Sequence, residues 1–153
     1  MPRYAAFGFN NRMGEFRLVI AVVDDEEGVR KALRRLFLAT NIDGRTFETG
    51  EAFLASLATV RPDCVVLDLQ MPGMTGLDIL ERLAACDTQL PAVVITAYDE
   101  PGSRERCLAA GASAYLRKPL DEHILLDTIE DAIERAHRSS AMSVGWSRPL
   151  GEP

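Results

Sequence analysis

The sequence predicts an α/β protein in which a parallel sheet lies between two layers of helices, and two observations carry this prediction. Five apolar, strand-like segments alternate along the chain with five segments whose apolar residues recur at helical spacing. A parallel strand that follows another through a helix requires a right-handed crossover, and such crossovers place helices on the faces of the sheet. The 153 residues, of which 47% are hydrophobic and 26% charged, suit one packed domain.

The strand predictions rest on short apolar runs that end in polar residues. The first run, residues 18–23, is rich in β-branched residues and is followed directly by Asp24 and Asp25. A continuous apolar run is typical of a strand that is buried on both faces of a parallel sheet. The same reasoning predicts further strands at residues 44–47, 63–68, 91–96 and 112–116.

The helix predictions rest on apolar residues spaced three and four apart. The first helix is predicted to begin at Glu26, with acidic residues at its start and basic residues further along, as the helix dipole favours. Asp121 is expected to cap the start of the last helix, and Gly111 to follow the end of the fourth. The other helices are predicted at about residues 49–57, 77–84, 100–110 and 121–136.

The two ends of the chain lack this periodicity. We therefore expect an N-terminal arm over residues 1–17, one domain over residues 18–138 and a C-terminal tail over residues 139–153. One domain with two short arms leaves no space for an effector, so we expect the output to lie in another molecule or in sequence beyond this chain.

Charge and composition exclude several classes of protein. The 17 basic and 23 acidic residues give a net charge of −6, which argues against direct binding to nucleic acid. No apolar run approaches the roughly 20 residues that span a bilayer, and no signal peptide is recognisable, so no membrane contact is expected. Three cysteines without a CxxC pair favour a reducing, cytoplasmic location.

Polar residues follow four of the predicted strands, at the edge where an open parallel sheet binds ligands. Asp24 and Asp25 follow the first strand, Asp68 and Thr96 end the third and fourth, and Lys118 follows the fifth. Three neighbouring carboxylates repel one another unless a cation joins them. A site that offers only oxygen ligands and remains partly hydrated favours Mg²⁺.

This set of groups has what is needed to accept a phosphoryl group. A cation and an ammonium neutralise the charge on the phosphoryl oxygens, and a carboxylate oxygen is the in-line nucleophile. Asp68 is the best candidate for the nucleophile, because the third strand places it between the other acids on one side and Thr96 and Lys118 on the other.

Four short motifs together resemble one family. They are the pair Asp24-Asp25, the loop DLQMPGMTG at residues 68–76, the pair Thr96-Ala97, and YLRKP at residues 115–119. In this order and at strand ends they resemble the receiver domains of two-component response regulators, over about residues 18–138. Among receivers, the sequence is most similar to those of helix-turn-helix regulators of the nitrogen-fixation type.

The resemblance implies a flavodoxin-like (βα)5 fold, a three-layer sandwich with a five-stranded parallel sheet in the order 2-1-3-4-5. It implies that Asp68 is the phosphoacceptor and that Lys118 contacts a phosphoryl oxygen. Thr96 would move to bind the phosphate, and Tyr115 would turn inward into the space that Thr96 leaves. The Lys118–Pro119 bond would be cis. The Mg²⁺ ligands implied are Asp24, Asp25, Asp68 and the backbone carbonyl of Gln70.

The resemblance also implies partners and an output. The phosphoryl donor would be a sensor histidine kinase or a phosphotransfer protein, and the signal would pass to a downstream effector protein. The output face would be formed by the fourth helix, the fifth strand and the fifth helix, and a phosphorylation-dependent homodimer would form there. Such a domain is a phosphoacceptor that catalyses its own phosphoryl transfer and dephosphorylation, and it is not an enzyme in the usual sense.

Other functions remain open from the sequence. A phosphatase of the haloacid-dehalogenase type would carry a second Asp two residues after the nucleophile, where this chain has Gln70. Neither a P-loop nor a dinucleotide-binding glycine motif occurs in the sequence. A receiver-like interaction module that is not regulated by phosphate, and the receiver fragment of a DNA-binding transcriptional regulator, are the two remaining alternatives.

Overall fold

The computed structural model describes residues 17–147, with side chains through residue 139. Within these residues, five parallel strands form one sheet in the order β2-β1-β3-β4-β5. This arrangement confirms the predicted α/β, flavodoxin-like fold and its strand order. The strands are β1 (Val19–Val23), β2 (Asp43–Phe47), β3 (Cys64–Asp68), β4 (Ala92–Thr96) and β5 (Ala114–Arg117).

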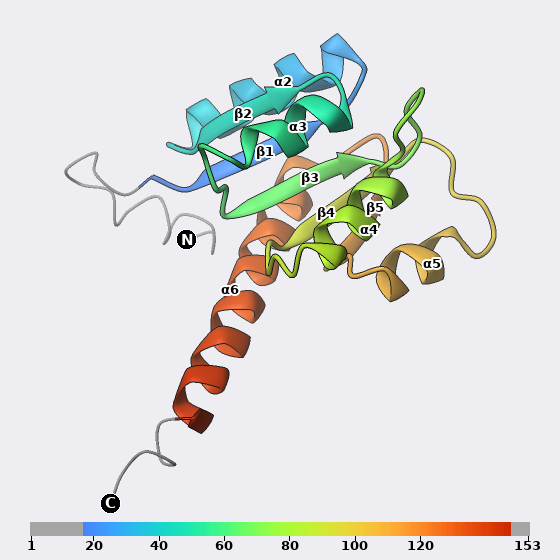
Figure 1. Cartoon of the computed structure of the whole chain (residues 1–153). Helices are drawn as coiled ribbons and strands as arrows, with labels where there is room; N and C mark the ends of the chain where they lie inside the picture. The colour runs from blue at the N-terminus through green and yellow to red at the C-terminus, as the bar shows by residue number, and fades with distance from the viewer. Residues whose placement is uncertain (1–16, 148–153) are drawn as a thin grey trace, which may run out of the picture.

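Helices cover both faces of the sheet (Figure 1). Because side chains alternate along a strand, Ile20 and Val22 of β1 pack with α2 and α6, whereas Ala21 and Val23 pack with α3, α4 and α5. The two apolar layers are separate clusters, one on each side of the sheet. The helices are α2 (Glu27–Ala39), α3 (Gly50–Ser56), α4 (Gly76–Ala85), α5 (Ser103–Ala109) and α6 (Glu122–Ser147).

Local capping interactions explain where several helices begin and end. The Thr49 hydroxyl accepts a hydrogen bond from the Ala52 amide at 3.1 Å at the start of α3. The Asp121 carboxylate accepts one from the Ile124 amide at 3.0 Å at the start of α6, as predicted. Gly111 follows the end of α5 with a φ of 111°, a left-handed conformation that glycine adopts without steric cost.

Some element boundaries differ from the prediction. Helix α5 begins at Ser103 and not at residue 100, because Gly102 precedes it in a left-handed conformation with a φ of 84°. Glu26 is the N-cap of α2 and not its first helical residue. A reciprocal capping box between Thr75 and Asp78 starts α4. The sequence pattern predicts only a loop at residues 68–76 and does not indicate this cap.

Helix α6 continues to Ser147, beyond the end of the predicted domain at residue 138, and extends away from the sheet (Figure 1). Residues 1–16 of the predicted N-terminal arm and residues 148–153 of the predicted tail lie outside the described residues. The predicted domain boundaries therefore stay predictions.

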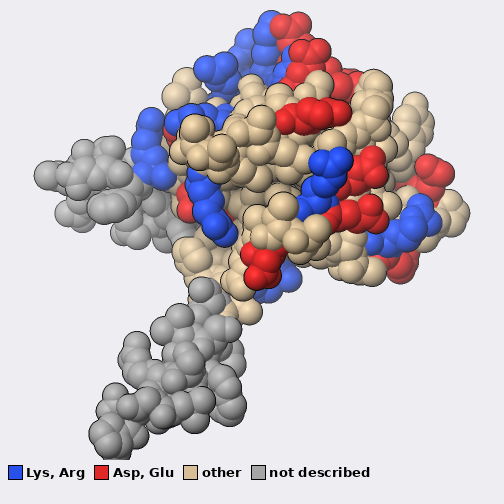
Figure 2. Space-filling model, viewed as in Figure 1, with Lys and Arg blue, Asp and Glu red and all other residues tan. Residues whose placement is uncertain are grey.

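The surface carries both signs of charge despite the acidic excess. Figure 2 shows acidic and basic side chains side by side on one face, with a group of basic side chains over α2. The exposed basic residues of that helix are Lys31, Arg34 and Arg35. Among the described helices, none is both long and apolar enough to cross a membrane.

Gly76 joins α4 closely to the end of β3. A Cβ atom at this position would lie 2.6 Å from the backbone oxygen of Asp68 and 3.0 Å from the Cα of Leu69. Backbone atoms cannot move aside as a flexible side chain can, so glycine is required for this approach.

We expect Gly76→Ala to lower the free energy of unfolding by about 1–3 kcal/mol, because the added methyl group pushes α4 away from β3. Gly28→Ala is the matched control, since a Cβ at Gly28 in α2 meets nothing within 4 Å. That substitution is expected to be neutral or to stabilise by up to about 1 kcal/mol, because alanine favours the helix. Urea unfolding measures both, and equal effects would contradict the close packing at Gly76.

Candidate functional site

The carboxyl ends of four strands meet at one edge of the sheet. In the parallel register Asp68 lies beside Ile95, and Thr96 lies beside Arg117. The backbone amide of Lys118 donates to the carbonyl of Thr96 at 2.8 Å, which ties the residue after β5 to the end of β4. The Lys118–Pro119 bond is cis, as expected. The sheet therefore brings residues from distant parts of the chain to one place.

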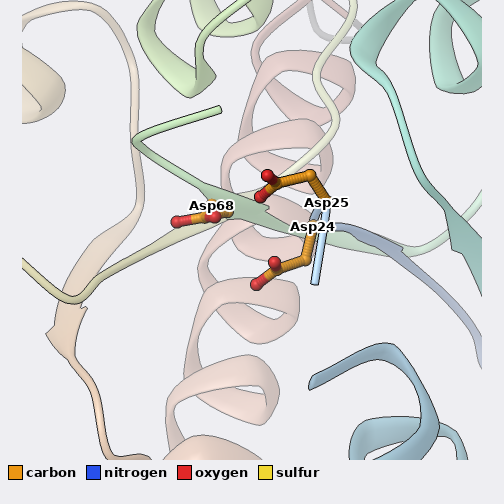
Figure 3. A group of neighbouring side chains, drawn as sticks. All are labelled: Asp24, Asp25 and Asp68. Atoms are coloured by element: carbon orange, nitrogen blue, oxygen red, sulfur yellow. The ribbon is translucent and has the colours of Figure 1, made fainter. Parts of the chain in front are cut away.

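Three carboxylates gather at this edge. Asp24, Asp25 and Asp68 each have an oxygen within 4.8 Å of the others (Figure 3). Asp24 is fully buried and Asp68 is only 3% exposed, whereas Asp25 is exposed. Two negative groups are thus largely removed from water, and a third faces solvent beside them.

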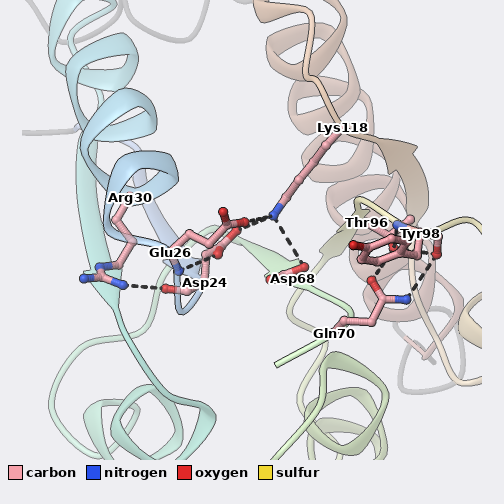
Figure 4. A network of polar contacts seen from close by, with 8 residues as sticks. All are labelled: Asp24, Glu26, Arg30, Asp68, Gln70, Thr96, Tyr98 and Lys118. Carbon is pink, nitrogen blue, oxygen red and sulfur yellow. Dashed lines mark hydrogen bonds and ion pairs between the residues drawn. The ribbon is translucent and has the colours of Figure 1, made fainter. Parts of the chain in front are cut away.

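The ammonium of Lys118 provides the compensating charge. It lies 3.0 Å from an oxygen of Asp24, 3.1 Å from Glu26 and 3.6 Å from Asp68 (Figure 4). The Lys118 side chain is only 13% exposed, so these contacts are partly shielded from water. Lys118 therefore contacts Asp24 and Glu26 more closely than Asp68.

Two further residues hold Asp24, and the sequence pattern does not place either of them at the site. The backbone amide of Glu26 donates to Asp24 Oδ1 at 2.9 Å, and the Arg30 guanidinium donates to the Asp24 carbonyl at 2.8 Å. The only sequence signal for Glu26 was its position directly after Asp25, which was interpreted as a favourable charge at a helix start. Nothing in the sequence distinguishes Arg30 from the other basic residues of α2.

The local charges shift two pKa values. Burial, together with the negative charge of Asp24, raises the pKa of Asp68 to about 7, although Lys118 acts in the opposite direction. Burial lowers the pKa of Lys118, but its hydrogen bonds to Asp24 and Glu26 outweigh this effect, so its pKa is raised overall. Lys118 consequently keeps its positive charge at neutral pH. This one positive charge does not fully compensate the neighbouring carboxylates.

Thr96 belongs to a second polar network next to the carboxylates. Its hydroxyl is buried and lies 2.7 Å from Gln70 Oε1 and 2.9 Å from the Tyr98 carbonyl. The Tyr98 amide donates back to the hydroxyl at 3.1 Å, and the Tyr98 side chain is 70% exposed. Figure 4 shows this network and the Lys118 contacts on either side of Asp68.

Tyr115 is already buried in this structure, with only 6% of the residue exposed. Its hydroxyl donates to Asp99 Oδ1 at 3.0 Å, and Asp99 also lies 3.9 Å from the Arg117 guanidinium. Burial and the Asp99 contact raise the pKa of the Tyr115 phenol, so it remains a hydrogen-bond donor. The expected inward turn of Tyr115 stays a prediction. Because the ring is already buried here, such a turn would have to start from a position other than the one in this structure.

The residues present fit a divalent cation held by oxygen. Magnesium binds oxygen ligands at about 2.1 Å, so its ligand atoms lie about 3–4 Å apart, and one oxygen of each of these carboxylates lies within 4.8 Å of the others. Burial, and after it the neighbouring charge of Asp24, disfavours the ionised form of Asp68, and a bound cation would favour that form.

The raised pKa of Asp68 predicts that the stability of the folded protein depends on pH. An unfolded Asp ionises near its model value of 3.8, whereas folded Asp68 keeps its proton until about pH 7. The folded state therefore holds more protons between these values, and the contribution of Asp68 to stability is lost as the pH rises from about 4 to 7.

We expect Asp68→Asn to raise the free energy of unfolding by about 1–3 kcal/mol at pH 8 in EDTA, and to change it little at pH 4. The neutral amide removes the ionised form that the site disfavours. Urea unfolding across this pH range measures the difference between the variant and the original chain. A difference that is constant with pH would contradict the raised pKa of Asp68.

Comparisons with known proteins identify the family of the chain. The model of the response regulator receiver domain family matches residues 20–130. The chain is 33% identical to the transcriptional regulatory protein FixJ of Rhizobium meliloti over 115 residues, which are 75% of this chain and 56% of FixJ. It is 34% identical to the DNA-binding transcriptional regulator NtrC of Salmonella typhimurium over 117 residues, which are 76% of this chain and 25% of NtrC. The chain thus spans about half the length of one relative and a quarter of the other.

Solved structures show the same likeness. The crystal structure of FixJ-N has a TM-score of 0.72 and 32% identity, over 78% of this chain and 95% of that one. A response regulator receiver protein from Burkholderia phymatum has a TM-score of 0.70 and 41% identity, over 77% of this chain and 96% of that one. With its family model, its relatives and its sheet topology in agreement, the chain belongs to the family of response regulator receiver domains.

Proposed function

We propose that this domain accepts a phosphoryl group on Asp68 from a phosphohistidine of a sensor histidine kinase or a phosphotransfer protein. The observation that carries this proposal is the placement of Asp68, nearly buried, in a cluster with two further carboxylates and 3.6 Å from the Lys118 ammonium. A group in this position has a nucleophilic oxygen, a compensating cation and acids able to hold a metal ion within a few ångströms.

The reaction is a transfer between two nucleophiles. An oxygen of ionised Asp68 forms a bond to phosphorus while the bond from phosphorus to the donor imidazole nitrogen breaks, and the electron pair stays on that nitrogen. Lys118 already lies 3.6 Å from Asp68 and needs only a small movement to contact a phosphoryl oxygen.

Magnesium is the cation that we assign to the site. Asp24, Asp25, Asp68 and the backbone carbonyl of Gln70 would hold it, with Asp24 acting directly or through water. When bound, the ion neutralises charge on the transferring phosphoryl group. Asp24 is the most constrained of the three acids, because its two oxygens are engaged by Lys118 and by the Glu26 amide.

The signal would leave the site through Thr96 and Tyr115. Thr96 lies at the end of β4, and Tyr115 lies in β5 beside α5, so a movement of Thr96 toward the phosphoryl group would be transmitted to the surface of α5, β5 and α6. A downstream effector, or a second copy of the chain, would recognise that surface. The cytoplasmic location expected from the sequence remains a prediction.

The chain can also serve as the receiver part of a longer DNA-binding regulator. This second candidate is favoured by the relatives, since FixJ and NtrC are named as transcriptional regulators and the chain spans only part of each. The chemistry proposed at Asp68 is the same in both cases, and the two differ only in where the effector lies.

Incubation with acetyl phosphate and Mg²⁺ tests the proposed function directly. We expect mass spectrometry to show one added phosphoryl group, which is absent in Asp68→Asn and absent when EDTA is present. Asp127→Asn is the matched control, since Asp127 lies in α6 and is not one of the clustered carboxylates, and it should leave incorporation unchanged. If the chain takes up no phosphoryl group while a known receiver does, it is an interaction module instead.

Magnesium should also stabilise the folded protein. At pH 8 and saturating Mg²⁺ we expect a gain in unfolding free energy of about 1–3 kcal/mol, because only the folded state assembles the three acids. Asp25→Asn should lose most of this gain, whereas Asp127→Asn should keep it. Thermal unfolding with and without EDTA measures the effect, and an equal gain in Asp25→Asn would place the ion elsewhere.

A further inference from the structure

The side chain of Gln70 links two loops at the edge of the sheet. Its Oε1 atom accepts from the Thr96 hydroxyl at 2.7 Å, and its Nε2 atom donates to the Tyr98 carbonyl at 3.1 Å. Figure 4 shows the amide turned toward Thr96 and Tyr98. The opposite orientation of the amide would set its oxygen against the Tyr98 carbonyl oxygen, so the network itself selects the observed one.

The Thr96 hydroxyl has only one proton to donate. Two acceptors already compete for it, Gln70 Oε1 at 2.7 Å and the Tyr98 carbonyl at 2.9 Å. The Tyr98 amide occupies the acceptor side of the same hydroxyl at 3.1 Å. Thr96 is fully buried while these partners are in place. A phosphoryl oxygen on Asp68 therefore gains this proton only if Gln70 and Tyr98 lose it.

The Gln70 side chain and the Tyr98 carbonyl differ in how each is connected to Thr96. The Tyr98 carbonyl is part of the backbone that follows β4, and it moves with Thr96. Gln70 comes from the other loop, two residues after Asp68, and its bond crosses from the β3 side of the site to the β4 side. The Gln70 contact is therefore the one that must break for Thr96 to change position relative to Asp68.

On the premise of phosphoryl transfer to Asp68, we propose that Gln70 is a positioning residue that holds the Thr96 hydroxyl in the resting arrangement. Its side-chain amide opposes the movement of Thr96 toward a phosphoryl group, while its backbone carbonyl is left for the metal ion. The side chain of one residue thus sets how readily the domain responds, and its main chain serves the chemistry.

The test is a double-mutant cycle with beryllofluoride, a phosphoryl analogue, in the presence of Mg²⁺. Gln70→Met keeps the length of the side chain and removes both hydrogen bonds, and we expect it to tighten beryllofluoride binding about three- to tenfold, the range typical of one hydrogen bond. In the Thr96→Val background, which lacks the hydroxyl, the same substitution should change binding by less than about twofold. Isothermal titration measures the affinities.

Two controls separate this role from a general effect on the fold. Gln89→Met changes the other glutamine of the chain, an exposed residue just before β4 at the opposite edge of the sheet, and should leave binding unchanged. Gln70→Met should leave the affinity for Mg²⁺ alone unchanged, because the assigned ligand at residue 70 is the backbone carbonyl.

Equal or weaker beryllofluoride binding by Gln70→Met would overturn the role of Gln70, and so would an equal gain in the Thr96→Val background. In either case the original chain still binds the analogue, and the proposed function stands. If the original chain binds no beryllofluoride with Mg²⁺, the proposed function fails and the role of Gln70 fails with it.

Discussion

The contact between Lys118 and the carboxylates at the edge of the sheet is the interaction on which the site depends. Asp24 is buried completely, and an unpaired carboxylate in that position would be strongly disfavoured. Lys118, 94 residues further along the chain, compensates it at a distance of 3.0 Å, so the site is complete only when β1 and the segment after β5 are both in place. Burial and the charge of Asp24 raise the pKa of Asp68 to about 7, and the single positive charge of Lys118 does not offset them. The site is thereby stable but short of positive charge, which is the condition that favours a cation.

The groups assigned to the phosphoryl oxygens already have partners in the resting structure. Lys118 contacts Asp24 and Glu26, and the Thr96 hydroxyl contacts Gln70 and the Tyr98 carbonyl. A phosphoryl group would exchange these contacts for new ones and would not simply add to them. Only the difference between the two sets drives the change of state, so the resting partners matter as much as the phosphoryl contacts.

The sequence was sufficient to predict the fold class, because apolar runs that end in aspartate or threonine mark buried parallel strands whose ends meet at one edge. The strand order followed from the resemblance to receiver domains and not from this pattern. The pattern of strand ends also placed Asp24, Asp25 and Asp68 together. It did not identify Glu26, because the sequence shows an acid at a helix start in the same way whether it caps the helix or reaches a distant lysine. It also placed the start of α5 three residues early, since the left-handed turn at Gly102 interrupts a pattern that otherwise continues.

The side-chain role of Gln70 illustrates a limit of sequence patterns of this kind. The motif places residue 70 two positions after Asp68 in the sequence. Only the arrangement of the loops that follow β3 and β4 shows that its amide contacts Thr96 and Tyr98. Glu26 and Gln70 thus act on the two sides of Asp68, one through the ammonium and the other through the hydroxyl. In the proposed function neither residue supplies the nucleophile, so substitutions at these two positions would change the balance between the two states while the chemistry at Asp68 is retained. The threshold of the response is therefore a property of the surrounding contacts, separable from the phosphoryl transfer itself.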